Sequence, residues 1–214
     1  MRNPANRMTS AKPGHRCADC RLVLADCLCA LIPRLETRTH VVLILHQMEA
    51  SKTSNTGLLA LRCLPNSSIV IRGAPGRPIT DTRWNQTSDA DTVLLFPHPD
   101  ARPIDSWRDH PRPLTLVVPD GTWRQAQRVR RRVPGLFNAP CGVVTRGAPS
   151  AYRLRTTWDP KRLATLEAIA EALGVLEGPV TRDALLRIFD VMVERSLRLR
   201  SPPPRNRRDS STVP

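Results

Sequence analysis

Short apolar runs alternate with polar segments along most of the chain. Five runs have the length and composition of buried strands, at residues 41–45, 68–71, 92–96, 114–118 and 142–145. Polar or turn-forming residues follow each run, and stretches with helical spacing lie between several of them. The pattern therefore predicts an α/β fold, with a mostly parallel sheet and helices on both of its faces.

Apolar residues spaced three and four positions apart predict three further helices. A short helix follows the first strand, around residues 58–64. A longer helix begins at the start signal Asp159-Pro160 and continues to Gly174, and the last begins near Thr181. The apolar positions that define the two later helices are Leu163, Leu166, Ile169, Ala170, Leu173, Leu185, Ile188, Phe189 and Met192.

The stretch 114–133 combines a buried strand, a sharp turn and a capping-box pattern of Thr122 and Gln125. It predicts one helix with an apolar stripe of Trp123, Ala126, Val129 and Val133. Asp120 then stands at the carboxyl end of a strand, just ahead of a helix, where open α/β sheets bind their ligands. Alternatively, Asp120 only caps the helix.

The chain has 214 residues and a formal net charge of +14 at pH 7, with most of the positive charge supplied by arginine. Such a field attracts polyanions by counterion release, so nucleic acid is the first partner to consider. An arginine-rich proteome is the alternative explanation. The sequence has neither an apolar run of membrane-spanning length nor the apolar segment of a signal peptide. We therefore expect a cytoplasmic protein without membrane association, and the sequence predicts no protein partner.

Four cysteines lie within thirteen residues, as Cys17-x2-Cys20-x6-Cys27-x-Cys29. In a reducing compartment, clustered cysteines indicate a metal rather than disulfides. Four thiolates suit tetrahedral zinc, with an iron–sulfur cluster as the alternative, and they leave no open position for catalysis, so a structural role is predicted. Free thiols are the remaining possibility. The isolated Cys63 and Cys141 are typical of small buried residues.

Familiar catalytic motifs are absent from the sequence: it has no G-x-G-x-x-G after a strand, no P-loop and no Ser-His-Asp set. The motifs that remain resemble those of the DTW-domain family over roughly residues 15–195. They are Asp120-Gly-Thr-Trp123 after a strand, the four-cysteine cluster, His46-x-x-Glu49, Asn55-Thr56-Gly57-Leu-Leu-Ala60, Leu-Leu-Phe-Pro at 94–97, and Arg155 with Ala164-Thr-Leu-Glu-Ala168.

The resemblance implies a tRNA-uridine aminocarboxypropyltransferase with a SPOUT-like, knotted fold. Such enzymes transfer the 3-amino-3-carboxypropyl group of S-adenosylmethionine to N3 of a uridine, giving acp3U and 5′-methylthioadenosine. In bacteria the expected position is the variable loop of tRNA. Two residues depart from the family pattern: Gln47 stands where the family has proline, and Ala164 stands where it has serine.

With this resemblance the chain divides into four parts. Residues 1–15 are predicted to be disordered, and residues 16–36 to form the zinc module. Residues 37–197 form the DTW, SPOUT-like catalytic domain. Residues 198–214, rich in proline and arginine, are predicted to be a basic disordered tail.

Asp120 is the first candidate for the base that removes the proton from uridine N3, and Glu49 is the second. Each has a simpler interpretation, as a helix cap and as a solvated loop charge. The predicted contacts to S-adenosylmethionine are Asn55, Thr56, Pro97, Thr122, Arg155 and Thr165. Arg155 suits the methionine carboxylate or a tRNA phosphate, unless it is simply a surface residue.

The predicted tRNA contacts are Trp123, Arg124, Arg128 and Arg131. Trp123 suits stacking on a base, and the arginines suit the phosphate backbone. The alternatives are a tryptophan in the core and a solvated helix face.

Three other functions remain open from the sequence. A SPOUT-type RNA methyltransferase keeps the fold and the donor, and so does an aminocarboxypropyltransferase acting on ribosomal RNA. A zinc-ribbon RNA-binding protein, in which Asp120 is only structural, is the non-enzymatic alternative.

Overall fold

The computed structural model describes residues 15–76, 79, 89–145, 149–154 and 162–200. Some predictions concern residues outside these ranges. They are the disordered segment at residues 1–14, the cofactor contact Arg155, the helix start signal at Asp159-Pro160, and the tail beyond residue 200.

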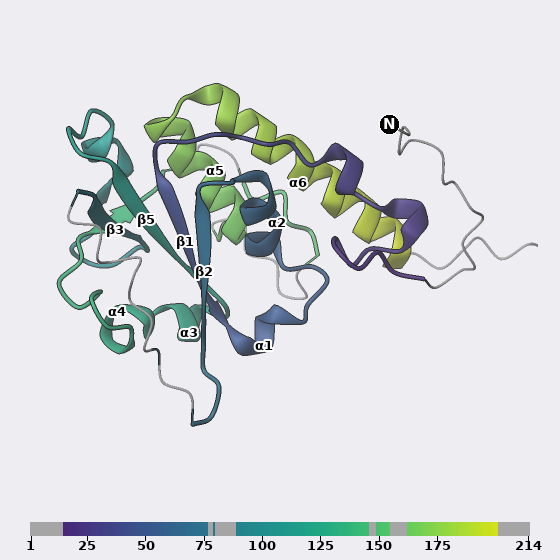
Figure 1. The fold of residues 1–214 in the computed structure, drawn as a ribbon, viewed down its shortest axis with the longest axis horizontal. Coiled ribbons are helices and arrows are strands. Elements are labelled where there is room, and N and C mark those ends of the chain that lie inside the picture. The colour runs from purple at the N-terminus through teal and green to yellow at the C-terminus, as the bar shows by residue number, and fades with distance from the viewer. Residues whose placement is uncertain (1–14, 77–78, 80–88, 146–148, 155–161, 201–214) are drawn as a thin grey trace, which may run out of the picture.

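The described part of the chain contains a six-stranded parallel sheet in the order β2-β1-β5-β3-β6-β4 (Figure 1). This confirms the predicted α/β class with a mostly parallel sheet. The five expected strands are all present, and the two-residue edge strand β4 was not predicted. The strands are β1 His40–His46, β2 Ser67–Arg72, β3 Asp91–Leu95, β4 Arg102–Pro103, β5 Leu114–Asp120 and β6 Cys141–Val143. The knot stays a prediction.

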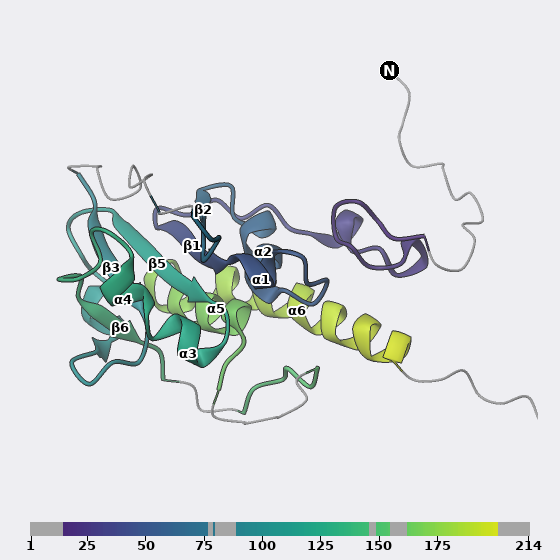
Figure 2. The same cartoon turned by 90° about the horizontal axis from the view of Figure 1, so that it is seen from below.

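Helices pack on both faces of the sheet, as the alternating pattern predicts. Residues of α2 (Thr56–Cys63), α5 (Thr165–Leu176) and α6 (Pro179–Arg200) pack on one face, together with the 3₁₀ helix Ile104–Trp107. Residues of α3 (Trp123–Ala126) and α4 (Val129–Arg132) pack on the other. Figure 2 shows α5 and α6 side by side below the strands in that view. The four-residue helix α1, Gln47–Ala50, directly follows β1.

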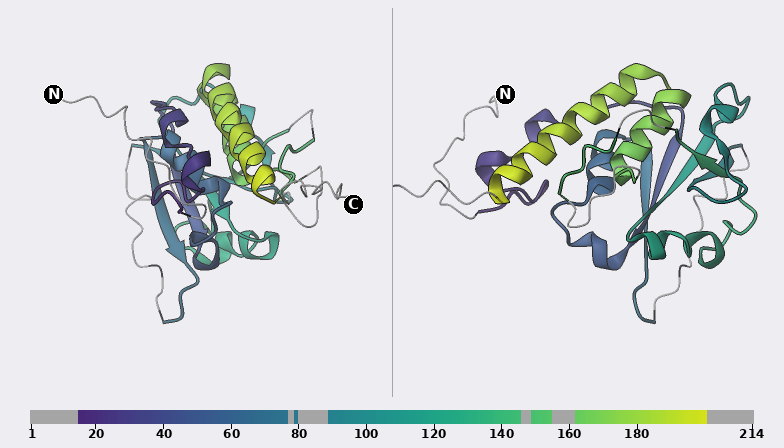
Figure 3. Two further views of the ribbon diagram at one scale, coloured as in Figure 1. Left: turned by 90° about the vertical axis from the view of Figure 1, so that its right-hand side faces the viewer. Right: turned by 180° about the vertical axis from the view of Figure 1, so that it is seen from behind.

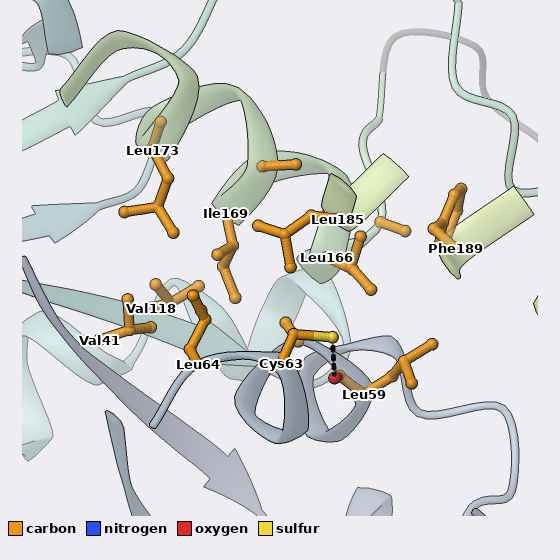
Figure 4. Close-up of a cluster of buried hydrophobic side chains, with 14 of the residues drawn as sticks. Val41, Leu59, Cys63, Leu64, Val118, Leu166, Ile169, Leu173, Leu185 and Phe189 are labelled. Atoms are coloured by element: carbon orange, nitrogen blue, oxygen red, sulfur yellow. Dashed lines mark hydrogen bonds between the residues drawn. The ribbon is translucent and has the colours of Figure 1, made fainter. Parts of the chain in front are cut away.

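The central strand β1 shows why this sheet is buried on both sides. Val41, Leu43 and Leu45 belong to the core under α2, α5 and α6, whereas Val42 and Ile44 belong to the core under α3 and α4. Successive side chains of a strand point to opposite faces, so a continuous apolar run supplies both cores. Figure 4 shows the larger core, where side chains of α2 and α5 meet those of the sheet.

The single helix predicted after Thr122 is wrong, because the chain forms two short helices there. The amide of Arg128 donates to the carbonyl oxygen of Gln125, three residues back, which tightens the backbone between α3 and α4. Ala126, Val129 and Val133 still pack on the sheet, as predicted, but Trp123 is 43% exposed and does not belong to that stripe.

Helix α5 begins later than its predicted start signal, because Ala164 is extended and the first helical residue is Thr165. The helix also passes through Gly174. A Cβ atom at Gly174 would lie 2.9 Å from Cβ of Arg182, so the glycine allows α5 and α6 to approach closely. Helix α6 ends at Arg200 and so includes the first three residues of the predicted tail.

The cysteine-rich segment lies against the carboxyl-terminal half of α6 (Figure 3). Its regular structure consists of the 3₁₀ turns Leu24–Asp26 and Cys29–Leu31. Leu22 and Leu28 are buried in the larger core, and Arg195 of α6 donates to the carbonyl oxygen of Cys27 at 2.6 Å. Among the described helices, none combines the length and the apolar character that crossing a membrane requires.

Candidate active site and metal site

Asp120, the last residue of β5, lies almost fully buried at the carboxyl edge of the sheet, with 7% of its surface exposed. Both of its carboxylate oxygens accept hydrogen bonds. Nδ2 of Asn55 donates to Oδ2 at 2.6 Å, and Oγ1 of Thr165 donates to Oδ1 at 2.5 Å. Gly57 permits this arrangement, because a Cβ atom there would lie 2.9 Å from Leu43 and 3.1 Å from Oδ2.

Burial raises the pKa of the Asp120 carboxyl above its usual value. The hydrogen bonds from Thr165 and Asn55 oppose this shift, and the nearby negative charge of Glu49 adds to it. A carboxylate destabilised by burial and yet fixed by two donors is a good proton acceptor. The cap of α3 is Thr122 and not Asp120, whose carboxylate instead contacts the starts of α2 and α5.

A polar cavity of about 300 Å³ lies over Asp120. Its lining includes Glu49, whose carboxylate accepts from Nζ of Lys52 at 2.6 Å, and Tyr152, whose hydroxyl donates to the carbonyl oxygen of Ser54 at 2.9 Å. The full lining is Glu49, Lys52, Ser54, Asn55, Thr56, Asp120, Gly121, Thr122, Tyr152 and Thr165.

A second, larger cavity of about 530 Å³ adjoins the polar one, and Gly121, Thr122 and Thr165 line both. Apolar side chains dominate its remaining lining, which includes Leu95, Phe96, Pro97, Val118, Val143, Val144 and Leu163. The ring of Trp123 packs against Phe96 with centroids 5.1 Å apart, and the guanidinium of Arg162 lies over the same indole. The two cavities form one composite site with a polar and an apolar part.

The sequence-predicted site residues fall into three groups in the structure. Asp120, Glu49, Asn55, Thr56, Thr122 and Thr165 come together around the polar cavity, and Pro97 and Trp123 line the apolar one. Arg124 and Arg131 are exposed and Arg128 is half-buried, and none of these three lines either cavity. Arg155 is outside the described residues.

The predicted cofactor contacts also have local structural roles. Asn55 caps α2, because its Oδ1 accepts from the amide of Leu58 at 2.8 Å. The buried Thr56 hydroxyl accepts a long hydrogen bond, 3.4 Å, from the amide of Leu166. Thr122 and Gln125 form the predicted capping box of α3.

Sequence analysis did not single out Glu167, a fully buried carboxylate in the first turn of α5. It accepts from the hydroxyl of Ser150 at 2.5 Å and from the amides of Ala151 and Ala164 at 2.8 and 2.7 Å. It thereby fixes the segment that carries Tyr152 into the polar cavity. Its place three residues after Ala164 is the signal that identifies it, since acidic residues there bond back to the start of a helix.

Substitution of Glu167 by alanine is expected to lower the free energy of unfolding by about 3 kcal/mol, because three donors around it lose their acceptor. Urea unfolding measures the effect. Glu194→Ala, at an exposed position of α6, is the matched control and should leave the midpoint nearly unchanged. Equal midpoints for both variants would show that water replaces the carboxylate at no cost.

The four N-terminal cysteines converge as predicted, with all four sulfur atoms within 4.8 Å of one another. Sγ of Cys17 lies 3.5 Å from that of Cys29, and Sγ of Cys20 lies 3.7 Å from that of Cys27. Sulfur atoms at the corners of a tetrahedron around zinc, with bonds of about 2.3 Å, are about 3.8 Å apart. The cluster therefore has dimensions compatible with zinc.

The surroundings of the cluster act on its thiols in opposite directions. A backbone hydrogen bond at Cys29 lowers the pKa of Cys27, but burial and the neighbouring cysteine side chains outweigh it and raise that pKa to about 12. Backbone hydrogen bonding at Cys20 lowers the pKa of Cys17 to about 7, against the opposing effect of burial. A guanidinium nitrogen of Arg62 also donates to Sγ of Cys29 at 3.4 Å. Thiolates are the form that binds metal, so the lowered pKa of Cys17 and the nearby Arg62 guanidinium suit a metal site, whereas the raised pKa of Cys27 opposes one until a metal ion binds.

Comparison with known proteins gives matches over most of the chain. The profile of the DTW domain family matches residues 14–197. Proteins named tRNA-uridine aminocarboxypropyltransferase 2 are 29% identical over 83% of this chain in Drosophila melanogaster and 31% identical over 78% of it in Macaca fascicularis. These alignments cover 74% and 58% of the relatives, so the chain spans less than two thirds of the macaque protein. No solved structure matches significantly.

Proposed function

The chain belongs to the DTW domain family, and on this premise we propose that it is a tRNA-uridine aminocarboxypropyltransferase. In the proposed reaction, N3 of a tRNA uridine receives the 3-amino-3-carboxypropyl group of S-adenosylmethionine, which gives acp3U and releases 5′-methylthioadenosine. The observation that carries the proposal is the buried Asp120 carboxylate in the wall of a polar cavity that adjoins an apolar one.

Asp120 is the proposed general base. Neutral uridine N3 carries a proton and is a poor nucleophile, so the carboxylate accepts that proton as the nitrogen attacks. The N3–C bond forms while the bond between that carbon and the sulfonium sulfur breaks. The electron pair of the broken bond stays on sulfur, which neutralises its positive charge. Asn55 and Thr165 hold the carboxylate in place during the proton transfer.

The donor is proposed to lie across the two cavities. The apolar cavity suits an adenosyl group, and the polar cavity suits an amino-acid arm and the uridine base. Thr122 and Thr165 line both cavities, so they are suited to fix the reacting carbon between them. Ala164 supplies no hydroxyl to this site, whereas the adjacent Thr165 hydroxyl bonds to Asp120.

Glu49 is the second candidate for the base, although its carboxylate is bonded to Lys52. Its charge also helps to raise the pKa of Asp120, so it suits an electrostatic role beside the base. We propose that the charge of Glu49 supports Asp120 as the base. Activity retained in an Asp120 variant would instead identify Glu49 as the base.

The RNA-binding surface is proposed to comprise the exposed face of Trp123 and the arginines of the α3–α4 segment. Trp123 is half-exposed at the rim of the apolar cavity, where a base can stack on it. Arg124, Arg128 and Arg131 suit the phosphate backbone. The variable loop of tRNA is the expected target, and the four cysteines are proposed to bind a structural zinc ion.

Mass spectrometry of nucleosides from unmodified tRNA, incubated with the protein and S-adenosylmethionine, tests the proposal. An aminocarboxypropyl mass gain on uridine, with 5′-methylthioadenosine as by-product, is the expected result. A methyl gain with S-adenosylhomocysteine would instead identify a methyltransferase. A gain on ribosomal RNA alone would change the substrate, and calorimetry without binding of S-adenosylmethionine would favour a non-enzymatic RNA-binding protein.

The acid limb of the pH–rate profile is expected to lie above the usual range of an aspartate, because burial raises the pKa of Asp120 and the base must be ionised. Thr165→Val removes a hydrogen bond that lowers this pKa, so the limb should move to still higher pH. Initial rates across a pH series measure the shift. Thr115→Val, a buried substitution at the other end of β5, should leave the limb in place.

The raised pKa of Asp120 affects stability in the opposite direction to the rate: the rate rises with pH, whereas this contribution to stability falls. The protonated Asp120 is favoured by burial, so its contribution to folding is present below the pKa of Asp120 in the unfolded chain and is lost as the pH rises through its pKa in the folded chain.

For the pH–rate profile, an acid limb that stays in place in Thr165→Val would show that Asp120 does not set that limb.

A further inference from the structure

Arg72, the last residue of β2, is a buried cation without a charged partner. Only 7% of its surface is exposed. One of its guanidinium nitrogens, Nη2, donates to the carbonyl oxygen of Gln125, while its buried Nε has no hydrogen-bond partner. Buried arginines are ordinarily paired with a carboxylate, and among the described residues Arg72 has none.

The charged neighbours of Arg72 are also arginines. Burial lowers the pKa of Arg72, and the positive charges of Arg132 and Arg128 lower it further. Arg128 directly precedes α4 and is half-buried. Arg132 is the last residue of α4 and is exposed. The bond from Arg72 to the carbonyl oxygen of Gln125 holds the buried guanidinium against the segment that carries Arg128 and Arg132. The like charges of these arginines repel that of Arg72, and a bound anion would offset the repulsion.

The three arginines lie at the same edge of the sheet as Asp120. Arg72 is paired with His46 in the β1–β2 register, and the preceding residue of β1, Leu45, is paired with Asp120. His46 also lies against both glycines that follow these strands. A Cβ atom at Gly73 would lie 2.6 Å from its Nε2, and one at Gly121 would lie 3.4 Å from its Cβ. A single residue of β1 therefore separates the Arg72 end of β2 from the catalytic end of β5.

We propose that Arg72, Arg128 and Arg132 form a phosphate site that binds the RNA backbone next to the modified uridine. This proposal rests on the proposed function for the identity of the polymer. Guanidinium groups bind phosphate through paired N–H donors, and arginine retains its charge even when buried. A phosphate here would hold the RNA strand beside Asp120 while the base enters the polar cavity.

The salt dependence of tRNA binding tests the site in the full-length protein. Binding of an unmodified tRNA transcript is measured across a salt series for the wild type, for Arg72→Gln and for the double variant Arg128→Gln/Arg132→Gln. The slope of log K against log salt should become shallower by about 0.7–0.9 for each lost phosphate contact. Arg108→Gln, an exposed arginine near the amino-terminal edge of the sheet, removes the same charge and should leave the slope unchanged.

The double variant decides the matter if Arg72→Gln fails to fold, because Arg128 and Arg132 lie nearer the surface. The phosphate site would be overturned if the salt slope stays unchanged in the folded variants of Arg72, Arg128 and Arg132. It would also be overturned if Arg108→Gln reduces the slope by the same amount. If acp3U forms but the slopes do not change, the proposed function stands and this site does not. If the slopes become shallower as expected but no uridine is modified, the phosphate site stands and the proposed function fails.

Discussion

Replacement of Asp120 by asparagine is expected to lower the rate of uridine modification by about 10²–10⁴-fold, the usual contribution of a general base. The amide has nearly the shape of the carboxylate, but it cannot take the proton from N3. Initial rates of acp3U formation and of 5′-methylthioadenosine release, measured at saturating tRNA and S-adenosylmethionine, give the effect on the chemical step.

The stability of this variant must be measured alongside its rate. Asparagine cannot accept hydrogen bonds from Asn55 and Thr165 with both terminal atoms, so a loss of about 1 kcal/mol in unfolding free energy is expected. Glu49→Gln is the matched control, since it removes a second carboxylate from the same cavity. A folded Asp120→Asn enzyme that retains its rate, with an inactive Glu49→Gln enzyme, would assign the base to Glu49.

The central strands could be predicted from the sequence because burial on both faces leaves an uninterrupted apolar run. β1 is of this kind, and β5 differs only by Thr115 within its run from Leu114 to Val118. β4 could not be found in this way, since Arg102–Pro103 is a two-residue edge strand with both residues exposed. Periodicity also failed after Thr122, because it cannot reveal a local three-residue hydrogen bond such as the one from Arg128 to Gln125.

The polar part of the site was predictable because its residues follow strands or begin helices at one edge of the sheet. Asp120, Asn55 and Thr165 all have such positions, and the parallel topology brings them together. Glu167 and Arg72 were missed for the opposite reason. A glutamate in a helix and an arginine before a glycine look solvated in a sequence, and only the packed fold buries them.

Loss of one cluster cysteine is expected to abolish zinc binding and to destabilise the whole domain. The described structure from Arg16 to Leu31 has only two three-residue 3₁₀ turns and one isolated bridge, so in the proposed zinc site the ion would be the main source of its order. That segment supplies Leu22 and Leu28 to the main core. Each buried leucine stabilises the fold by about 1.5–3 kcal/mol, and each kcal/mol raises the melting temperature by about 2–4 °C in a chain of this size.

Cys20→Ser is therefore expected to bind no zinc and to melt roughly 10 °C lower than the wild type. Elemental analysis and thermal unfolding measure the two effects. Cys63→Ala is the control, because it removes a buried cysteine outside the cluster and should keep one zinc per chain. If the wild type contains iron and sulfide instead of zinc, the same four cysteines bind an iron–sulfur cluster. Unchanged metal content in Cys20→Ser would remove that thiolate from the ligand set, and with it the argument that the cluster orders the contact with α6.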